Sequence, residues 1–356
     1  MRWKFWRKPP PPPPTGLTFE DYEKLRLIME MVSPESQPNT NHLGEVVRNI
    51  RLLSLNVKSL GYDLARQLAA ALPQPGETAA RHVGLKTSLS TQADIESDWV
   101  AHWCRELQVP LLFHRKLWEL SYILQAFHEN GMIAPGRRGL GFGSGSEPLS
   151  SYLASRGVAS TVTDLPIEAA QGRGWIETGQ HASGLDNAYH APLVTREQFD
   201  QLVDFRAVDM NDIPDDLTGY DFCWSVCALE HLGTIEKGLT FIERSLETIK
   251  PGGISVHTTE FNIEDGPTID NWPSVLFQRR HFVDLAERLE ARGHKVAEMD
   301  FNPGDKILDR FIDLPPWSHD ANSRELAAWV REPSHLKVGT DGFIATCAGI
   351  IITKAS

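Results

Sequence analysis

Glycine is concentrated in one stretch of the chain, 139-GLGFGSGSEPL-149, which places four glycines in seven residues. A chain omits that many side chains where its backbone turns sharply or approaches a ligand closely. A phosphate-binding P-loop requires Lys-Ser or Lys-Thr after its glycines, and neither pair follows here. A dinucleotide-binding loop requires Gly-x-Gly-x-x-Gly, whereas these glycines alternate strictly. An acid does lie near the expected distance, because Asp164 follows Gly145 by nineteen residues, at the end of the next predicted strand.

Two later segments carry side chains suited to acid–base chemistry. The run 220-YDFCWSVCALEHLG-233 ends in Glu230 and His231, and 257-HTTEFN-262 contains His257 and Glu260. Histidine titrates near neutral pH, so either ring could activate a hydroxyl nucleophile. We take His231 as the first candidate base, with His257 and Glu260 as the others. The alternatives are a helix-start pair at residues 230 and 231 and a hydrogen-bonded core histidine at 257.

Strand-like and helix-like runs alternate along the chain after Gly136. This alternation predicts an α/β fold, a Rossmann-like, doubly wound and mostly parallel sheet of seven strands with ligands at the strands' carboxyl ends. The last two strands are expected to form an antiparallel hairpin with a long excursion between them. We expect strands at 138–142, 158–165, 205–210, 220–226, 253–261, 295–301 and 343–354, and helices at 147–156, 234–249 and 279–292.

Three domains are expected. Residues 1–16 form a basic, aromatic tail with a proline spacer, residues 17–132 a helical region, and residues 133–356 the sheet domain. The mixture of Arg, Lys and Trp in residues 1–8 could give weak peripheral contact with an anionic membrane, and the alternative is a solubilising tail. An aromatic-rich helix is expected over 94–130.

A heptad pattern occupies residues 41–72 of the helical region. Apolar side chains recur there at alternating steps of three and four, which is the seam of a coiled coil. A self-associating helix would make the protein a homo-oligomer, whereas the alternative is an amphipathic helix packed on its own domain. The residues of this stripe are Leu43, Val46, Ile50, Leu53, Val57, Leu60 and Leu64.

Composition narrows the class of protein. The chain is 41% hydrophobic and 23% charged with a formal charge of −12, which argues against a nucleic-acid partner. Its four cysteines show no zinc-like or redox C-x-x-C spacing, so we expect reduced thiols in a cytoplasmic protein. Several histidines and acids are the alternative ligands for a divalent metal, but no fixed spacing supports this, and we expect no metal site. We expect no membrane-spanning segment or signal peptide, since no run approaches about 20 apolar residues.

The order of features after the glycine loop resembles that of the class I S-adenosylmethionine-dependent methyltransferases over roughly residues 115–356. Asp209 in 207-AVDMNDIP-214 closes the third strand, 220-YDFCWSV-226 is a buried fourth strand, and 250-KPGG-253 turns into the fifth. The terminal hairpin completes the set. A hydride-transferring Rossmann protein is not expected to end in that hairpin.

The resemblance implies S-adenosylmethionine as cofactor and a role for each residue near it. The glycine loop would lie against the methionine moiety, Asp164 would bind the ribose hydroxyls, and Asp209 the adenine amino group. Asp164 alternatively caps a helix, since Pro166 follows it, and Asp209 is alternatively a turn residue. The cofactor-binding residues implied are Gly141, Phe142, Gly143, Gly145, Glu147, Asp164, Leu165, Asp209, Met210, Ser225 and Cys227.

One position departs from the family pattern. The family usually has an acid at the start of its glycine motif, where this chain has Gly139. Glu147 is our candidate to hold the cofactor's amino group in its place, although it could instead serve a helix dipole. The long segments 171–193 and 302–342 are rich in aromatic and polar residues and suit a sugar-like acceptor. The candidate substrate contacts are Trp175, His181 and Trp272.

The sequence therefore predicts a methyltransferase that O-methylates a small polar or glycan acceptor by in-line displacement. Two other functions compete with this one. A nicotinamide-dependent oxidoreductase would use the same glycines and Asp164, but it leaves 207–214 and the hairpin unexplained. A non-catalytic scaffold would keep the fold, bind partners through residues 41–72 and hold the cofactor without using it, and the missing acid at Gly139 keeps this alternative open.

Overall fold

A computed structural model shows the chain as two compact units, Met1–Ser59 and Leu60–Ser356. The larger unit therefore begins before residue 133, where the sequence suggested a domain boundary. The reason is that β1 (Thr87–Leu89) pairs with β13 (Phe343–Thr353) and so joins the main sheet. The structure describes residues 16, 18–32, 37, 40–72, 79–144, 146–166, 184–315, 317 and 334–356.

The main sheet contains eleven strands in the described part of the chain, rather than the seven expected, in a Rossmann-like arrangement. Its parallel part has the order β5-β4-β3-β6-β7, and β13 runs antiparallel beside β7. These strands are β3 (Arg138–Phe142), β4 (Ala159–Asp164), β5 (Val203–Ala207), β6 (Tyr220–Val226) and β7 (Ile249–Asn262).

Short strands account for the difference in strand number. Along its other edge β13 pairs in turn with β12 (Lys337–Thr340), β1 and β8 (Lys295–Val296). The predicted strand 295–301 is thus divided into β8, which pairs antiparallel with β13 over two residues, and β9 (Met299–Asp300), which pairs with β1. Further short strands are β10 (Ile312–Asp313) on β12 and the separate pair β2 (Phe113–His114) and β11 (Ser334–His335).

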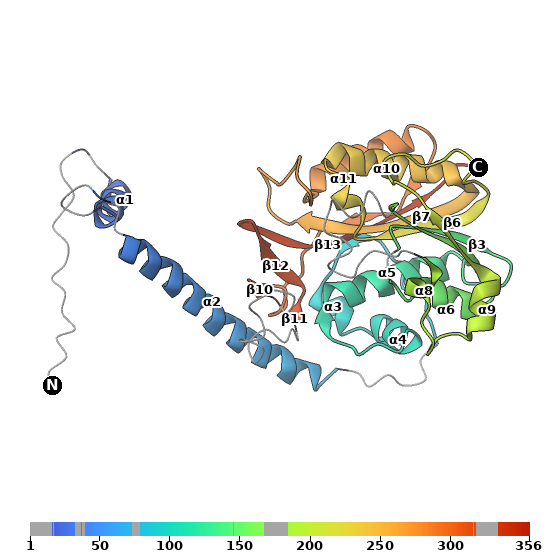
Figure 1. Ribbon diagram of the computed structural model, residues 1–356, viewed down its shortest axis with the longest axis horizontal. Coiled ribbons are helices and arrows are strands. Elements are labelled where there is room, and N and C mark those ends of the chain that lie inside the picture. The colour runs from blue at the N-terminus through green and yellow to red at the C-terminus, as the bar shows by residue number, and fades with distance from the viewer. Residues whose placement is uncertain are drawn as a thin grey trace. The chain divides into compact units, whose positions relative to one another are not determined.

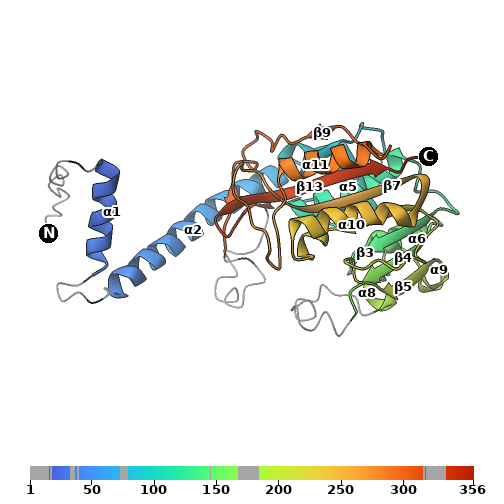
Figure 2. The ribbon, with the colours of Figure 1, turned by 90° about the horizontal axis from the view of Figure 1, so that it is seen from above.

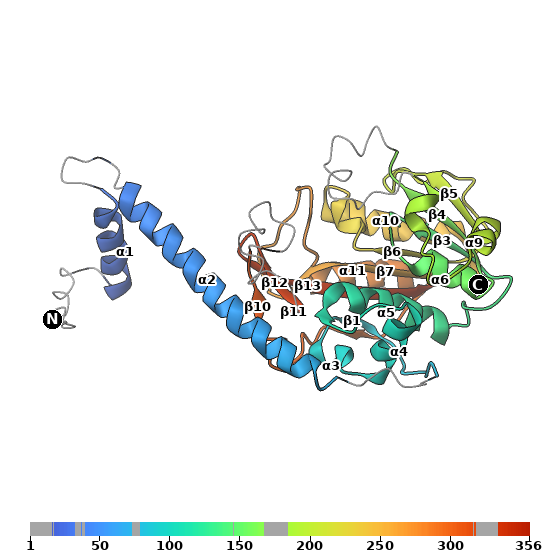
Figure 3. The same cartoon turned by 60° about the horizontal axis from the view of Figure 1, so that its bottom comes forward.

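Helices cover both faces of the sheet in the larger unit. Figure 1 shows α10 (Ile235–Thr248) and α11 (Arg279–Glu290) on one face, with α4 (Asp98–Glu106), α5 (Arg115–Glu129) and α6 (Leu149–Ser155) on the other. Figure 2 shows β7 and β13 side by side. In Figure 3 the face of the sheet that α5 covers is turned toward the viewer. Shorter helices are α3 (Gln92–Ile95), α8 (Leu185–Ala188), α9 (Arg196–Leu202) and the 3₁₀ turn Leu229–His231.

Burial explains why the central elements form. All of β6 is buried, as an apolar strand flanked by parallel neighbours must be. The middle of α5 is buried on every side, because the helix lies between the sheet and α4. Tyr122 of α5 packs over Gly349 of β13, where an added Cβ would lie 2.3 Å from its ring. A glycine at this point lets the helix approach the sheet.

The segment 94–130 is not one helix. It forms the end of α3, then α4, β2 and α5, because the chain turns after Leu107 at Gln108, whose φ is 54°, and Pro110 follows. Proline lacks the donor that a helix interior needs. The helix α5 begins at Arg115, which places Lys116 and Glu119 in its first turns.

The smaller unit contains α1 (Phe19–Glu30) and most of α2 (Thr40–Ala69), which continues into the larger unit. The predicted heptad stripe lies on α2. Four of its residues are exposed, namely Ile50, Leu53, Val57 and Leu60, while Leu64 packs against the core of the larger unit. The tail 1–8 and the side chain of Leu43 lie outside the described residues.

Among the described residues, no helix is both long enough and apolar enough to cross a membrane.

Candidate functional site

A cavity of about 420 Å³ lies where the order of the parallel strands reverses. From β3 the chain proceeds outward through β4 and β5, then returns to β6 on the other side of β3 and continues to β7. Loops after β3 and β6 therefore separate in opposite directions and leave a crevice between them. Its walls are Lys116, Leu120, Gly143, Ser146, Glu147, Pro148, Asp164, Leu165, Val208, Asp209, Met210, Val226, Cys227, Ala228, His231 and Leu232.

The glycine loop forms one wall of this cavity. Gly143 has a φ of 54°, and an added Cβ would lie 2.8 Å from the Cβ of Ala228. Gly141 serves packing, since its Cβ would lie 2.3 Å from Ser144 Oγ and 2.5 Å from the Trp224 ring. Phe142 lies in the core, edge-on to Phe241, rather than on the described wall. Gly145 lies outside the described residues.

Two carboxylates at strand ends face the same cavity. Asp164 is the last residue of β4, and Asp209 follows β5 by two residues. Their neighbours Leu165 and Met210 line the cavity too, so all four residues predicted here are brought together. Asp164 Oδ1 accepts from Leu165 N at 2.7 Å, and Asp209 Oδ1 accepts from Asn211 N at 2.8 Å. Asp209 therefore also closes a turn, as the alternative reading proposed.

Glu147 is an acid in the cavity wall with an unmatched oxygen. Its Oε2 is buried and has no hydrogen-bond partner among the described residues. Burial raises the pKa of Glu147 well above its usual range, and the Lys116 ammonium only partly opposes this effect. A carboxyl group with one buried oxygen that lacks a hydrogen-bond partner suits a cationic ligand, which would favour its ionised form.

His231 is the candidate base that the structure places on the cavity wall. It ends the 3₁₀ turn after β6, and its Nδ1 lies 3.1 Å from the carbonyl oxygen of Pro273. A carbonyl only accepts, so Nδ1 carries the hydrogen and donates it. In the neutral ring Nε2 is then the nitrogen able to take up a proton.

His257 lies in the core rather than on the described cavity wall. It is fully buried in β7 and contacts the hydroxyl oxygens of Ser225 at 2.8 Å, Ser255 at 2.6 Å and Ser245 at 3.2 Å. Burial lowers the pKa of His257 to about 3. Ser225 was expected near the cofactor's sulfur, but its hydroxyl takes part in this buried hydrogen-bond network.

Glu260 forms an ion pair and is not among the described residues that line the cavity. Arg115 Nη2 lies 2.6 Å from Glu260 Oε1, and both side chains are largely buried. Although burial alone would raise it, Arg115 holds the pKa of Glu260 below its usual range. Among the predicted substrate contacts, Trp272 is 59% exposed outside the described wall, and Trp175 and His181 lie outside the described residues.

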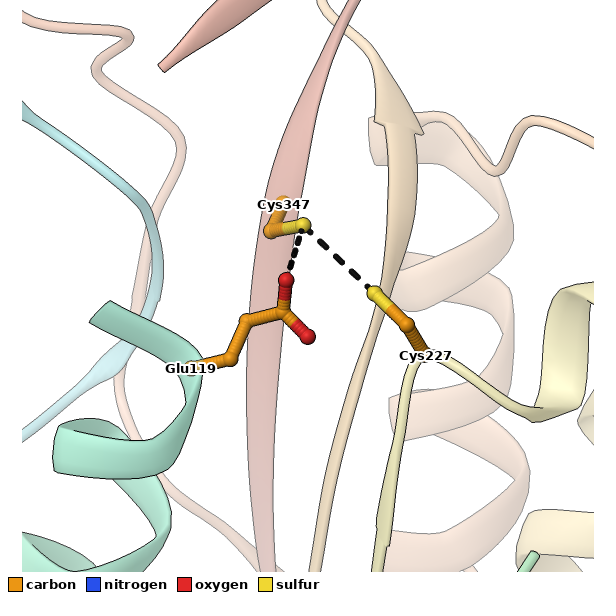
Figure 4. Close-up of side chains that lie close together, drawn as sticks. All are labelled: Glu119, Cys227 and Cys347. Atoms are coloured by element: carbon orange, nitrogen blue, oxygen red, sulfur yellow. Dashed lines mark hydrogen bonds between the residues drawn. The ribbon is translucent and has the colours of Figure 1, made fainter. Parts of the chain in front are cut away.

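Sequence reasoning missed a cluster of Glu119, Cys227 and Cys347, shown in Figure 4. Cys347 Sγ lies 2.9 Å from Glu119 Oε1 and 3.6 Å from Cys227 Sγ. Burial raises the pKa of both thiols, while Lys116 and Arg115 lower the pKa of Glu119 despite its burial. No local spacing could reveal this cluster, because its members come from α5, the end of β6 and β13.

Comparisons with known proteins found similarity only among solved structures. No family model and no curated protein matches the chain. It is similar to a putative sarcosine dimethylglycine methyltransferase from Galdieria sulphuraria, with 14% identity, 67% of this chain and 88% of that one covered, and a TM-score of 0.40. It is also similar to Haemonchus contortus phosphoethanolamine N-methyltransferase 2 in complex with S-adenosyl-L-methionine, with 13% identity, coverage of 65% and 52%, and a TM-score of 0.37.

The buried state of His257 predicts a pH dependence of stability. Folded His257 stays neutral down to about pH 3, whereas the unfolded imidazole binds a proton below pH 6.5. The unfolded state thus binds one more proton in this window, so the residue lowers stability by about 1.4 kcal/mol per pH unit as the pH falls. We expect His257→Gln to reduce the pH dependence of the free energy of unfolding between pH 6 and pH 4 by the contribution of one proton. Urea unfolding at a series of pH values measures this change.

His82→Gln is the matched control, because the His82 side chain is 73% exposed. Equal slopes for wild type and His257→Gln would contradict the burial of this ring.

Proposed function

We propose that the chain is a methyltransferase that binds S-adenosylmethionine in this cavity and transfers its methyl group to a small polar acceptor. The observation that carries the proposal is the cavity at the strand reversal, which is lined by acids at the ends of two adjacent strands and by Glu147, whose buried Oε2 has no hydrogen-bond partner among the described residues. The volume of about 420 Å³ suits a small-molecule ligand. The antiparallel β13 beside β7 matches the methyltransferase resemblance better than a nicotinamide-dependent enzyme.

Each strand end has a defined part in this proposal. Asp164 would accept hydrogen bonds from the two ribose hydroxyls, because its carboxylate ends β4 beside the glycine loop. Asp209 would accept from the adenine amino group, and the Met210 backbone would meet the ring edge. Gly143 allows close approach, since any side chain there would collide with Ala228.

Glu147 would hold the amino group of the cofactor. The usual acid of the family is replaced by Gly139, whose Cβ would lie 2.5 Å from the Phe222 ring and leaves no space for a side chain. Glu147 supplies a carboxyl group on the cavity wall with an oxygen that lacks a partner among the described residues. An ammonium group next to it would stabilise the ionised carboxylate.

The reaction requires alignment and a base. S-adenosylmethionine, when bound, supplies an electrophilic methyl group on sulfur. The cavity wall orients the acceptor in line with that group and excludes water. His231 Nε2 would take the proton from an acceptor hydroxyl, while Nδ1–H keeps the ring in place on the Pro273 carbonyl. We infer a sugar or glycan hydroxyl as acceptor from the aromatic and polar segments, which include Trp175 and His181.

We also propose that α2 mediates homo-oligomerisation. Four apolar residues at heptad a and d positions, from Ile50 to Leu60, are 44–74% exposed on a 30-residue helix. Such a seam is stabilised by a second copy of the same helix, which buries both stripes. The weak membrane contact of residues 1–8 and a cytoplasmic location stay predictions.

The cofactor assignment predicts a ligand-dependent rise in thermal stability. S-adenosylhomocysteine at about a hundred times its dissociation constant should add about 2.7 kcal/mol to the free energy of unfolding. Asp164→Ala should weaken binding about tenfold or more, because a hydrogen bond to a charged group contributes about 1.5–3 kcal/mol. Differential scanning fluorimetry of both proteins measures the shift.

Asp186→Ala, at a side chain 86% exposed, is the matched control and should keep the shift. A shift with NADH alone would favour an oxidoreductase, and a shift with neither ligand would favour the scaffold.

The base assignment predicts a loss of turnover with binding retained. His231→Gln should lower kcat by roughly 10²–10⁴-fold, which is the usual contribution of a general base. The affinity for S-adenosylhomocysteine should not change. The measurement is S-adenosylhomocysteine release with a panel of monosaccharides and nucleotide sugars, with His82→Gln as control. Unchanged kcat in His231→Gln would reject this residue as the base.

The heptad stripe predicts assembly that depends on one face of α2. Leu53→Asp should convert the oligomer to a monomer in light scattering after gel filtration, because it places a charge in the seam. Leu52→Asp is the matched control, since Leu52 is 58% exposed and Leu53 64% exposed but only Leu53 lies on the stripe. A monomeric wild type, or equal effects of both changes, would reject the coiled coil.

A further inference from the structure

We propose that Glu119, Cys227 and Cys347 form a zinc site with three protein ligands and an open fourth position. The three ligand atoms lie within 4.8 Å of one another, which makes them the group that could hold a metal among the described residues. Thiolate and carboxylate ligands together suit Zn²⁺.

The spacing of the two sulfurs fits a tetrahedral metal. With Zn–S bonds of about 2.3 Å, two thiolates on one zinc lie about 3.7 Å apart. Cys227 Sγ and Cys347 Sγ lie 3.6 Å apart and are not bonded to each other. In the contact of 2.9 Å between Cys347 Sγ and Glu119 Oε1 the thiol donates a hydrogen bond, and this distance would lengthen if a metal replaced the proton.

The carboxylate of Glu119 is oriented for this role by its second oxygen. Oε2 accepts from Thr258 Oγ1 at 3.1 Å and from Lys116 Nζ at 3.3 Å, which leaves Oε1 facing Cys347. Outer contacts of this kind commonly fix the ligands of a metal. The two thiols and the carboxylate therefore converge on one point without rearrangement of the helix α5.

Cys227 provides an independent observation. Its φ is 44°, in the left-handed region where a residue with a Cβ costs about 1–2 kcal/mol. Backbone strain of this kind is found where the surrounding structure requires a particular conformation. Here it directs the thiol at the end of β6 toward Cys347 on β13 (Figure 4).

Charge balance permits a divalent ion despite the nearby cations. Lys116 pairs with Glu119 and Arg115 with Glu260, so the four charged groups cancel. Zn²⁺ displaces two thiol protons to solvent, which leaves the net charge of the cluster unchanged and involves no redox step. Because Cys227 also lines the cavity, water or a donor atom of a bound molecule would fill the fourth position.

The test is titration of metal-free, full-length protein with ZnCl₂ by isothermal calorimetry. We expect one Zn²⁺ per chain, and we expect Cys227→Ser and Cys347→Ser each to weaken binding by roughly 100-fold or more, since even the loss of an outer contact costs 10–100-fold. Cys104→Ser and Cys223→Ser are matched controls at the two other free, buried thiols and should bind as wild type does. No binding by the wild type, or equal loss in all four variants, overturns the proposal.

A second measurement needs no variant. Free thiols are mostly protonated at pH 7, so zinc binding to two of them should release about two protons. Repeating the titration in buffers of different ionisation enthalpy gives this number. Release of no proton, as expected for a site made only of carboxylates, overturns the proposal. Neither measurement requires cofactor, so failure of the methyltransferase proposal would leave this one intact.

Discussion

The reversal of strand order between β3 and β6 is the constraint on which the site depends. These two parallel strands are neighbours, but the chain leaves them in opposite directions along the sheet. The loops that follow them therefore leave a crevice at the carboxyl ends of the strands. The loops after β3 and β6 and the ends of β4 and β5 then meet around one cavity. Small residues are required where they meet, as Gly143 against Ala228 shows.

A second requirement is the balance of buried charge beside this cavity. The first turn of α5 brings Arg115 and Lys116 against the acids Glu260 and Glu119, which the surrounding strands bury. An isolated ion would be costly in such surroundings, and each of these has an opposite charge within contact distance. Glu147 lacks such a partner for one oxygen among the described residues, and this is why we propose that a cationic group of the ligand pairs with it.

Local pattern was enough to predict the centre of the fold. The strands at 138–142 and 220–226 have the predicted bounds, because short, mainly apolar runs between turns leave few alternatives. The sequence also predicted acids at the ends of two strands, and Asp164 and Asp209 do line the cavity. The sequence favoured His231 as the base, but it could not show that His257 is buried within β7, because that burial arises only from packing. It could not show β1, a strand of three residues, or the cluster at Glu119, whose members meet only through the tertiary fold.

The position of β13 has a consequence for synthesis of the protein. This strand occupies residues 343–353, well after β7 in the sequence, yet it lies inside the sheet, with β7 on one side and β12, β1 and β8 along the other. During translation, which proceeds from the N-terminus, β7 therefore emerges long before its partner. Until residues 343–353 leave the ribosome, the backbone of β7 from Ile254 to Asn262 presents an edge of unpaired N–H and C=O groups. The nascent chain should thus be a client of chaperones that bind exposed strand edges, and this dependence should end only when β13 inserts beside β7.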